Sequence, residues 1–187
     1  KDLHAIASEF GIEVCIVSLK KNQCQEQVRI SSSLIRQALE EGQIDRANQM
    51  LGRAYSLSGK VIKGQQIGRT IGFPTANLQV PESKFLPRFG VYAVSVAIEN
   101  ESANTSGDQS LIPGVMNIGC RPTVEGNSPT IEIHLLDWSG NLYDRTLTVY
   151  LQEFIRSERK FSSLDALKEQ IAKDCNLAKQ KLIDNVL

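Results

Sequence analysis

From Tyr55 onward the sequence consists of short strand-like runs separated by glycine and proline. Residues 91–98 alternate aromatic and branched side chains on one face with smaller residues on the other, and residues 131–135 and 147–151 each place branched apolar side chains on one face. Side chains that alternate in this way point to opposite faces of a β-strand. Several such strands with frequent turn residues predict a small antiparallel β-barrel or sandwich.

The segments around these strands have other patterns. The polar residues 99–110 are expected to form an exposed loop between two strands. Residues 164–182 place apolar side chains three and four positions apart, which predicts a C-terminal helix. Ser162 with Asp165 predicts a capping box at the start of that helix. Cys175 lies on its apolar face and needs no chemical role.

The first 54 residues have the pattern of a different domain. Apolar spacing predicts a helix over residues 2–10 and two more between residues 34 and 51. Residues 14–17 are apolar on both faces, as in a central strand of a parallel sheet. A single central strand leaves its backbone groups unpaired. We therefore expect residues 1–54 to be the end of a truncated α/β domain, followed by a second domain over residues 55–187.

Composition excludes several classes of function. The 187 residues include 21 lysines and arginines and 21 aspartates and glutamates, and this balance argues against nucleic-acid and membrane partners. No apolar run approaches the length of a membrane span or a signal-peptide core, so we expect a cytoplasmic protein. The four cysteines form no CxxC pair and are expected to be reduced thiols. Because the chain begins with Lys1, we expect a fragment or a processed product.

A glycine-rich stretch precedes the second strand-like run. Its glycines and basic residues are Gly59, Lys63, Gly64, Gly68, Arg69 and Gly72. Glycines allow backbone amides to approach a phosphate closely, and the basic side chains add positive charge. On its own the stretch favours a hairpin with a glycine-rich turn. No Gly-Lys-Ser/Thr follows, which argues against a P-loop.

The next stretch, Phe73-Pro74-Thr75-Ala76-Asn77, carries two oxygen groups. The Thr75 hydroxyl and the Asn77 amide are two residues apart, so an extended backbone points both in the same direction. Hard oxygen ligands of this kind suit Mg²⁺ that bridges nucleotide phosphates. The alternative is a turn rich in small polar residues.

Together these residues resemble the riboflavin kinase family, whose signature is a glycine-rich strand and loop that runs into Pro-Thr-Ala-Asn. The resemblance covers residues 55–180 and implies a mainly β fold, a Greek-key-like barrel with a C-terminal helix. It continues through Gly90-Val91-Tyr92-Ala93, Asn117-Ile118-Gly119, Arg121-Pro122-Thr123, Glu132-Ile133-His134, Leu142-Tyr143 and the segment from Phe154 to Phe161.

The upstream residues resemble the end of the adenylyltransferase domain in bacterial bifunctional riboflavin kinase/FAD synthetases. Residues 30–36 are similar to a nucleotidyltransferase motif in which Ser32, Ser33 and Arg36 would hold ATP phosphates; ordinary N-capping by serine is the alternative. Leu51-Gly52-Arg53 matches the junction with the kinase module. The superfamily's His-x-Gly-His motif is absent, so the chain alone is not expected to make FAD. Asp144 follows Leu142-Tyr143 where the family usually has glycine.

The resemblance implies a role for each candidate site residue. Glu132 would be the base that accepts the proton of the riboflavin hydroxyl, and His134, about 7 Å further along the same strand face, would line the site or orient a loop. Thr75 and Asn77 would bind Mg²⁺ and ATP. The candidates for covering the phosphates are Gly64, Gly68 and Arg69, and those for binding the flavin are Arg121 and Arg156.

The predicted function is therefore ATP- and Mg²⁺-dependent phosphorylation of riboflavin to FMN. Two alternatives remain open at this point. The first is FMN adenylyltransferase activity, which would need an additional N-terminal domain in a longer parent chain. The second is a flavin- or nucleotide-binding barrel without catalysis; the presence of Thr75, Asn77 and Glu132 argues against it, since binding alone needs no positioned base.

Overall fold

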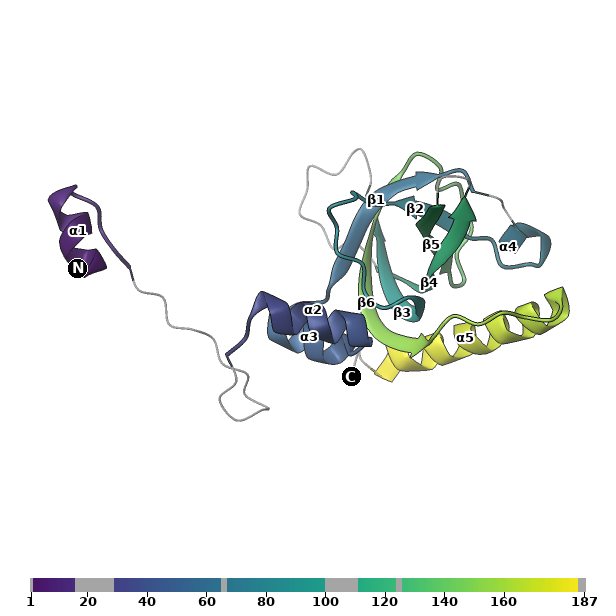
Figure 1. Ribbon diagram of the computed structural model, residues 1–187. Helices are drawn as coiled ribbons and strands as arrows, with labels where there is room; N and C mark the ends of the chain where they lie inside the picture. The colour runs from purple at the N-terminus through teal and green to yellow at the C-terminus, as the bar shows by residue number, and fades with distance from the viewer. Residues whose placement is uncertain (1, 16–28, 65–66, 100–110, 124–125, 185–187) are drawn as a thin grey trace. The chain divides into compact units, whose positions relative to one another are not determined.

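The computed structural model describes residues 2–15, 29–64, 67–99, 111–123 and 126–184 (Figure 1). The chain divides into two compact units, residues 1–32 and residues 33–187. The predicted loop falls almost entirely on residues 100–110, which lie outside the described residues.

In the first unit, helix α1 spans Leu3–Glu9, as the apolar spacing predicts. Its N-cap is Asp2, whose carboxylate accepts a hydrogen bond from the backbone N–H of His4 at 3.3 Å. The strand predicted over residues 14–17 is not observed in its described part, because Val14 and Cys15 belong to no strand. Apolar residues form a strand only where a neighbouring strand pairs with their backbone, and no described strand pairing includes these two residues. Residues 16 and 17 lie outside the described residues.

The second unit contains a closed six-stranded barrel, which confirms the predicted mainly β, antiparallel fold. Its strands are β1 (Ser56–Ile62), β2 (Ala76–Gln79), β3 (Gly90–Ile98), β4 (Ile112–Thr123), β5 (Gly126–Leu135) and β6 (Thr146–Arg156). They follow the order β1-β2-β5-β4-β3-β6, and β6 pairs with β1 to close the sheet. Every pairing is antiparallel. The glycine-rich stretch connects β1 to β2 and includes the short helix α4 (Ile67–Thr70).

The barrel interior is filled by the alternating apolar side chains predicted from the sequence. Ile131, Ile133 and Leu135 of β5 are buried, as are Leu147, Val149 and Leu151 of β6. In contrast, β3 is buried on both faces, because helix α5 (Leu164–Asp184) packs against it from outside (Figure 1). The outer face of β3 therefore belongs to a second packing layer between the barrel and α5.

The start of α5 differs from the prediction by one residue. The Ser163 hydroxyl, and not that of Ser162, accepts the hydrogen bond from the backbone N–H of Ala166 at 3.2 Å. Since the helix begins at Leu164, Ser163 is its N-cap. Asp165 then occupies the second helical position, which is too early for the predicted capping box.

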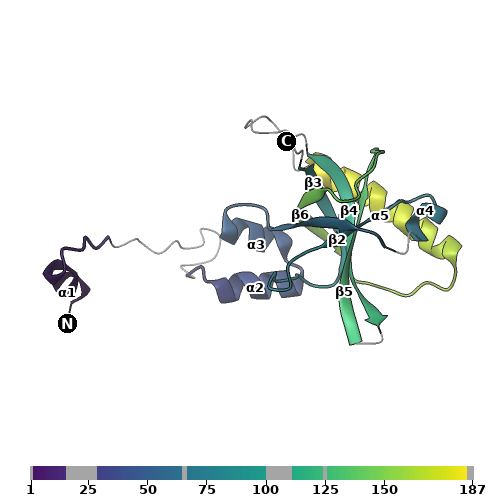
Figure 2. The ribbon, with the colours of Figure 1, turned by 90° about the horizontal axis from the view of Figure 1, so that it is seen from above.

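Helices α2 (Ser32–Glu41) and α3 (Ile44–Leu51) lie side by side next to the barrel, away from most of α5 (Figure 2). The Asn48 amide joins α3 to the barrel: it donates to the carbonyl oxygen of Leu151 at 2.9 Å and accepts from the backbone N–H of Tyr55 at 2.7 Å. Residues 33–54 thus share a compact unit with the strands. A domain boundary after residue 54 stays a prediction.

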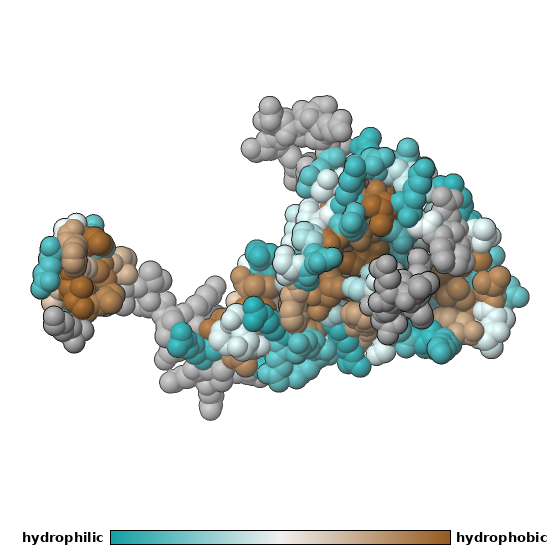
Figure 3. All heavy atoms as spheres, turned by 45° about the horizontal axis from the view of Figure 1, so that its top comes forward, coloured by the Kyte–Doolittle hydropathy of each residue, from teal (hydrophilic) through white to brown (hydrophobic). Residues whose placement is uncertain are grey.

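On the second unit, the face shown in Figure 3 has an apolar patch surrounded by hydrophilic residues. Of the helices that the structure describes, none has both the length and the apolar composition needed to span a bilayer.

Candidate functional site

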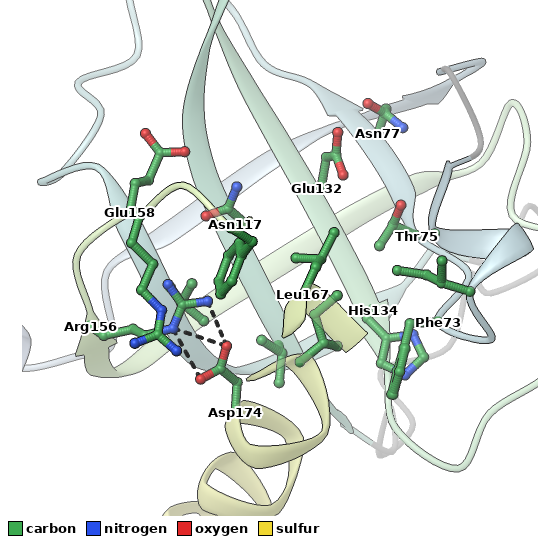
Figure 4. A pocket seen from close by; sticks show the side chains of 17 residues that line it. Phe73, Thr75, Asn77, Asn117, Glu132, His134, Arg156, Glu158, Leu167 and Asp174 are labelled. Atoms are coloured by element: carbon green, nitrogen blue, oxygen red, sulfur yellow. Dashed lines mark hydrogen bonds and ion pairs between the residues drawn. The ribbon is translucent and has the colours of Figure 1, made fainter. Parts of the chain in front are cut away.

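A cavity of about 330 Å³ lies between the outer face of the barrel and α5 (Figure 4). Thr75, Asn77 and Glu132, predicted from the sequence to act together, all line it. Its opposite wall contains Leu167 and Ile171 of α5. Polar groups and an apolar slot therefore share one cavity, as in most small-molecule sites.

Strand register explains why the polar side chains converge. Asn77 of β2 pairs with Glu132 of β5, and Glu132 pairs with Asn117 of β4. The same row continues from Asn117 to Val91 of β3 and from Val91 to Arg156 of β6. Directly paired residues present their side chains on the same face of a sheet. This row lies on the outer face, and all five residues line the cavity.

The glycine-rich segment lies close to the predicted metal and nucleotide residues. Gly64 lies directly against the Asn77 amide, and any Cβ at this position would collide with it. Gly68 lies against the carbonyl oxygen of Phe73 and accepts a hydrogen bond from the Phe73 backbone N–H at 2.8 Å. Only glycine permits so close an approach at both positions. The segment therefore folds back over Thr75 and Asn77.

His134 fixes the loop that carries Thr75. Its Nδ1 atom lies 2.8 Å from the carbonyl oxygen of Pro74, and since a carbonyl can only accept, Nδ1 carries the proton. The Phe73 ring packs edge-on against the imidazole, with 5.5 Å between centroids and an interplanar angle of 77°. This geometry matches the expectation that His134 lines the site or orients a loop: it does both.

Arg156 lies at the other end of the polar row. Its guanidinium binds the carboxylate of Asp174 on α5, with an Nη2–Oδ2 distance of 2.7 Å (Figure 4). Asp174 is only 3% exposed. Beside it, burial raises the pKa of the Cys175 thiol to about 11, so this thiol stays protonated near neutral pH.

A second cavity of about 380 Å³ adjoins the first, and Thr75 lines both. The second cavity is lined by Val61, Arg69 and the loop that contains Trp138 and Tyr143. Two cavities that share a lining residue can hold two substrates next to one another.

Three other predicted residues, of those with described side chains, do not line either cavity. Ser32, Ser33 and Arg36 are exposed at the start of α2 and line neither cavity. Arg121 has its backbone in β4 opposite Ser128, and its side chain lies outside the described parts of the chain.

Asn117 and Asp174 were not predicted as site residues. Asn117 lies in the Asn117-Ile118-Gly119 segment that resembles the family, but only the strand register reveals that it neighbours Glu132. The sequence pattern could have identified Asp174, because it shares one helix face with the apolar residues Leu167, Ile171 and Ala178. A carboxylate on a buried stripe requires a cation, although the helix alone does not identify Arg156 as that partner.

The site offers oxygen ligands to a hard cation, and these ligands do not form a cluster of charged groups. No group of three or more histidine, cysteine, aspartate or glutamate residues within the described ranges could hold a metal ion. The hydroxyl of Thr75 and the amide oxygen of Asn77 suit a cation such as Mg²⁺ that takes its other ligands from phosphate and water.

Comparisons with known proteins identify the family of this chain. The family model described as "Flavokinase: Riboflavin kinase" matches residues 51–182. The bifunctional riboflavin kinase/FMN adenylyltransferase of Escherichia coli K12 is 42% identical over 172 residues, which cover 92% of this chain and 51% of that protein. The chain thus spans about half the length of this curated relative.

Two solved structures are similar in fold. A structure described as a macrolide-efflux protein from Streptococcus pneumoniae has a TM-score of 0.79 and 31% identity, over 96% of this chain and 55% of that one. Riboflavin kinase from Trypanosoma brucei has a TM-score of 0.50 and 22% identity, over 68% and 76% of the two chains, and shows the shared fold. With the family model covering the whole barrel and α5 up to residue 182, this chain belongs to the riboflavin kinase family.

Proposed function

We propose that this chain transfers the γ-phosphoryl group of ATP to riboflavin and forms FMN, as the kinase part of a bifunctional riboflavin kinase/FMN adenylyltransferase. One observation carries the proposal: Thr75, Asn77 and Glu132 line one cavity, and a second cavity meets it at Thr75. The family match over residues 51–182 supports the same activity.

The two cavities suit the two substrates. Val91 and Val115 on the barrel and Leu167 and Ile171 on α5 form the apolar walls that a flat isoalloxazine ring requires. The aromatic and apolar lining of the second cavity suits an adenine ring. ATP bound there would direct its phosphates toward Thr75 and the segment around Gly68, where backbone amides and Arg69 favour negative charge.

The proposed reaction follows from the order of groups along the outer face. Glu132 accepts the proton of the 5′-hydroxyl as its oxygen bonds to the γ-phosphorus, and the bond between that phosphorus and the bridging oxygen breaks to release ADP. The family uses ATP as co-substrate, typically with a divalent metal. We propose that the metal is Mg²⁺, held by Thr75 and Asn77, where it neutralises phosphate charge.

The other predicted roles stay proposals. Arg156 and Arg121 would contribute to flavin binding, and Ser32, Ser33 and Arg36 would belong to the phosphate site of an adenylyltransferase domain. A cytoplasmic location also stays a prediction. FMN adenylyltransferase activity is proposed only for a longer parent chain.

Incubation of the chain with riboflavin, ATP and MgCl₂, followed by chromatographic separation of flavins, tests the proposal. We expect FMN without FAD, and no FMN when EDTA is added. Riboflavin binding without any FMN would instead support a non-catalytic flavin-binding barrel. Formation of FAD would show that this chain carries adenylyltransferase activity.

A further inference from the structure

Asp174 is the one charged or polar side chain that is buried among the residues described. It lies in the middle of α5 and lines the candidate riboflavin cavity. Burial of a carboxylate away from water costs free energy, unless charged partners compensate for its lost hydration. The phosphoryl transfer proposed above gives Asp174 no role, so its burial requires a separate explanation.

The partners of Asp174 occupy both of its oxygens. Arg156 Nε lies 3.1 Å from each oxygen, and Arg156 Nη2 lies 2.7 Å from Oδ2. Gln170, one turn earlier on α5, donates its amide N–H to Oδ1 at 2.7 Å. A side-on pairing of this kind fixes the plane of a guanidinium group as well as its position.

Arg156 is held from other directions as well. Its Nη1 atom donates to the carbonyl oxygen of Ser157 at 3.1 Å, and its Cζ atom lies 5.8 Å from the centre of the Phe161 ring. Arg156 forms the end of the polar row opposite Asn77. Figure 4 shows the Arg156–Asp174 pair on one side of the cavity and Phe73 and Thr75 on the other. The pair therefore shapes the end of the slot that is remote from the phosphates.

We infer that Asp174 is a positioning residue for riboflavin binding: it orients the Arg156 guanidinium and sets the flavin slot between α5 and the barrel before the substrate arrives. The inference rests on the proposed function. Without the Asp174 carboxylate, the long Arg156 side chain would turn toward water. Riboflavin binding would then have to restore its orientation, which lowers the affinity. Because ATP would enter the other cavity, its binding does not depend on this pair.

The chain contains a matched control. Lys181 of α5 and Glu153 of β6 form another ion pair between the same two elements, with an N–O distance of 2.8 Å. These side chains are 41% and 31% exposed and line neither cavity, whereas the Arg156 and Asp174 side chains are 20% and 4% exposed. Loss of the Lys181 pair should therefore loosen α5 slightly without changing the slot.

The experiment compares Asp174→Asn with Lys181→Met. Riboflavin affinity is measured by flavin fluorescence without ATP, and KM is measured for riboflavin and for ATP, at a temperature at which circular dichroism shows each variant folded. For Asp174→Asn we expect riboflavin Kd and KM to rise at least tenfold and the KM for ATP to stay within twofold. For Lys181→Met all three should stay within twofold.

A second variant separates orientation of Arg156 from stability of the fold. The double variant Arg156→Met/Asp174→Leu replaces the buried ion pair by an apolar pair, a change that is often neutral or stabilising. We expect its melting temperature to be near that of the parent and its riboflavin Kd to stay at least tenfold weaker. If the parent chain forms FMN, but Asp174→Asn or the folded double variant binds riboflavin with parental affinity, the inference is overturned. A parent chain that neither bound riboflavin nor formed FMN would overturn the proposed function itself.

Discussion

The inner and outer faces of the barrel consist of alternate residues of the same strands, yet on β5 they differ in both burial and polarity. On β5, Ile131 and Ile133 point inward and are 4% and 1% exposed. Glu132 and His134, one residue away along the strand, point outward and line the candidate site. The inner face holds the fold by apolar burial, and the outer face collects polar groups from four strands in one register row.

On β5, a residue's face, more than its position along the strand, determines which property it controls. Substitutions of polar residues on the outer face, such as Glu132, should change rates or affinities and leave stability nearly unaltered. Substitutions on the inner face should do the reverse, so neighbouring residues can be used to test the division.

The largest effect is expected from Glu132→Gln. The amide has nearly the same size but cannot accept the proton of the riboflavin hydroxyl, so turnover should fall by about 10² to 10⁴. The midpoint of urea unfolding should stay close to that of the parent, since Glu132 does not belong to the interior. Initial rates of FMN formation and urea titrations measure the two quantities. Turnover within threefold of the parent would remove Glu132 from the role of base.

Ile131→Ala tests the inner face at the adjacent position. Loss of a buried isoleucine side chain leaves a cavity and should lower the free energy of unfolding by about 2–5 kcal/mol. Urea unfolding followed by circular dichroism measures this loss. A loss below about 1 kcal/mol would show that the interior around β5 repacks, and would weaken the proposed division between the two faces.

Thr75→Val tests the proposed nucleotide end of the site. Valine keeps the shape of threonine but removes the hydroxyl, so affinity for the Mg²⁺ complex of ADP should fall by about tenfold, a change of about 1.4 kcal/mol. Riboflavin affinity without nucleotide should change little, because the flavin walls are formed by other residues. Calorimetric titration of ADP with and without MgCl₂ gives the measurement. Equal Mg²⁺-dependent affinity in both proteins would contradict the assigned role.

Much of the barrel was predictable because strand periodicity is a local property of the sequence. Alternation identified the inward residues of β5 and β6 correctly, and helical spacing identified α2, α3 and α5. Local patterns did not determine the order of strands around the barrel. That order depends on pairings between distant segments, such as β1 with β6.

The site was predictable in part for the same reason. Thr75 and Asn77 are two residues apart, so extended geometry alone places them together. Arg156 and Asp174 come from different elements, and only the packing of α5 on the barrel brings them within 2.7 Å. The Ser163 cap differs from the predicted one because adjacent serines are both suitable caps, and the path of the chain into the helix selects between them.

The smallest effect concerns Asp144, which belongs to neither face and lies in the turn before β6. Its backbone φ is +65°, a left-handed conformation that glycine adopts without strain, which agrees with the glycine that the sequence resemblance implies at this position. Its carboxylate lies 3.0 Å from Lys60 Nζ, but both side chains are mostly exposed, so this ion pair contributes little to stability.

Asp144→Gly and Asp144→Ala both remove the ion pair and differ only in the Cβ atom. The alanine variant should therefore be the less stable of the two by about 1 kcal/mol, with FMN formation unchanged in both. Equal urea midpoints for the two variants would show that the turn relaxes to another conformation once the carboxylate is gone, and that the ion pair with Lys60 rather than the backbone requirement holds Asp144 in place.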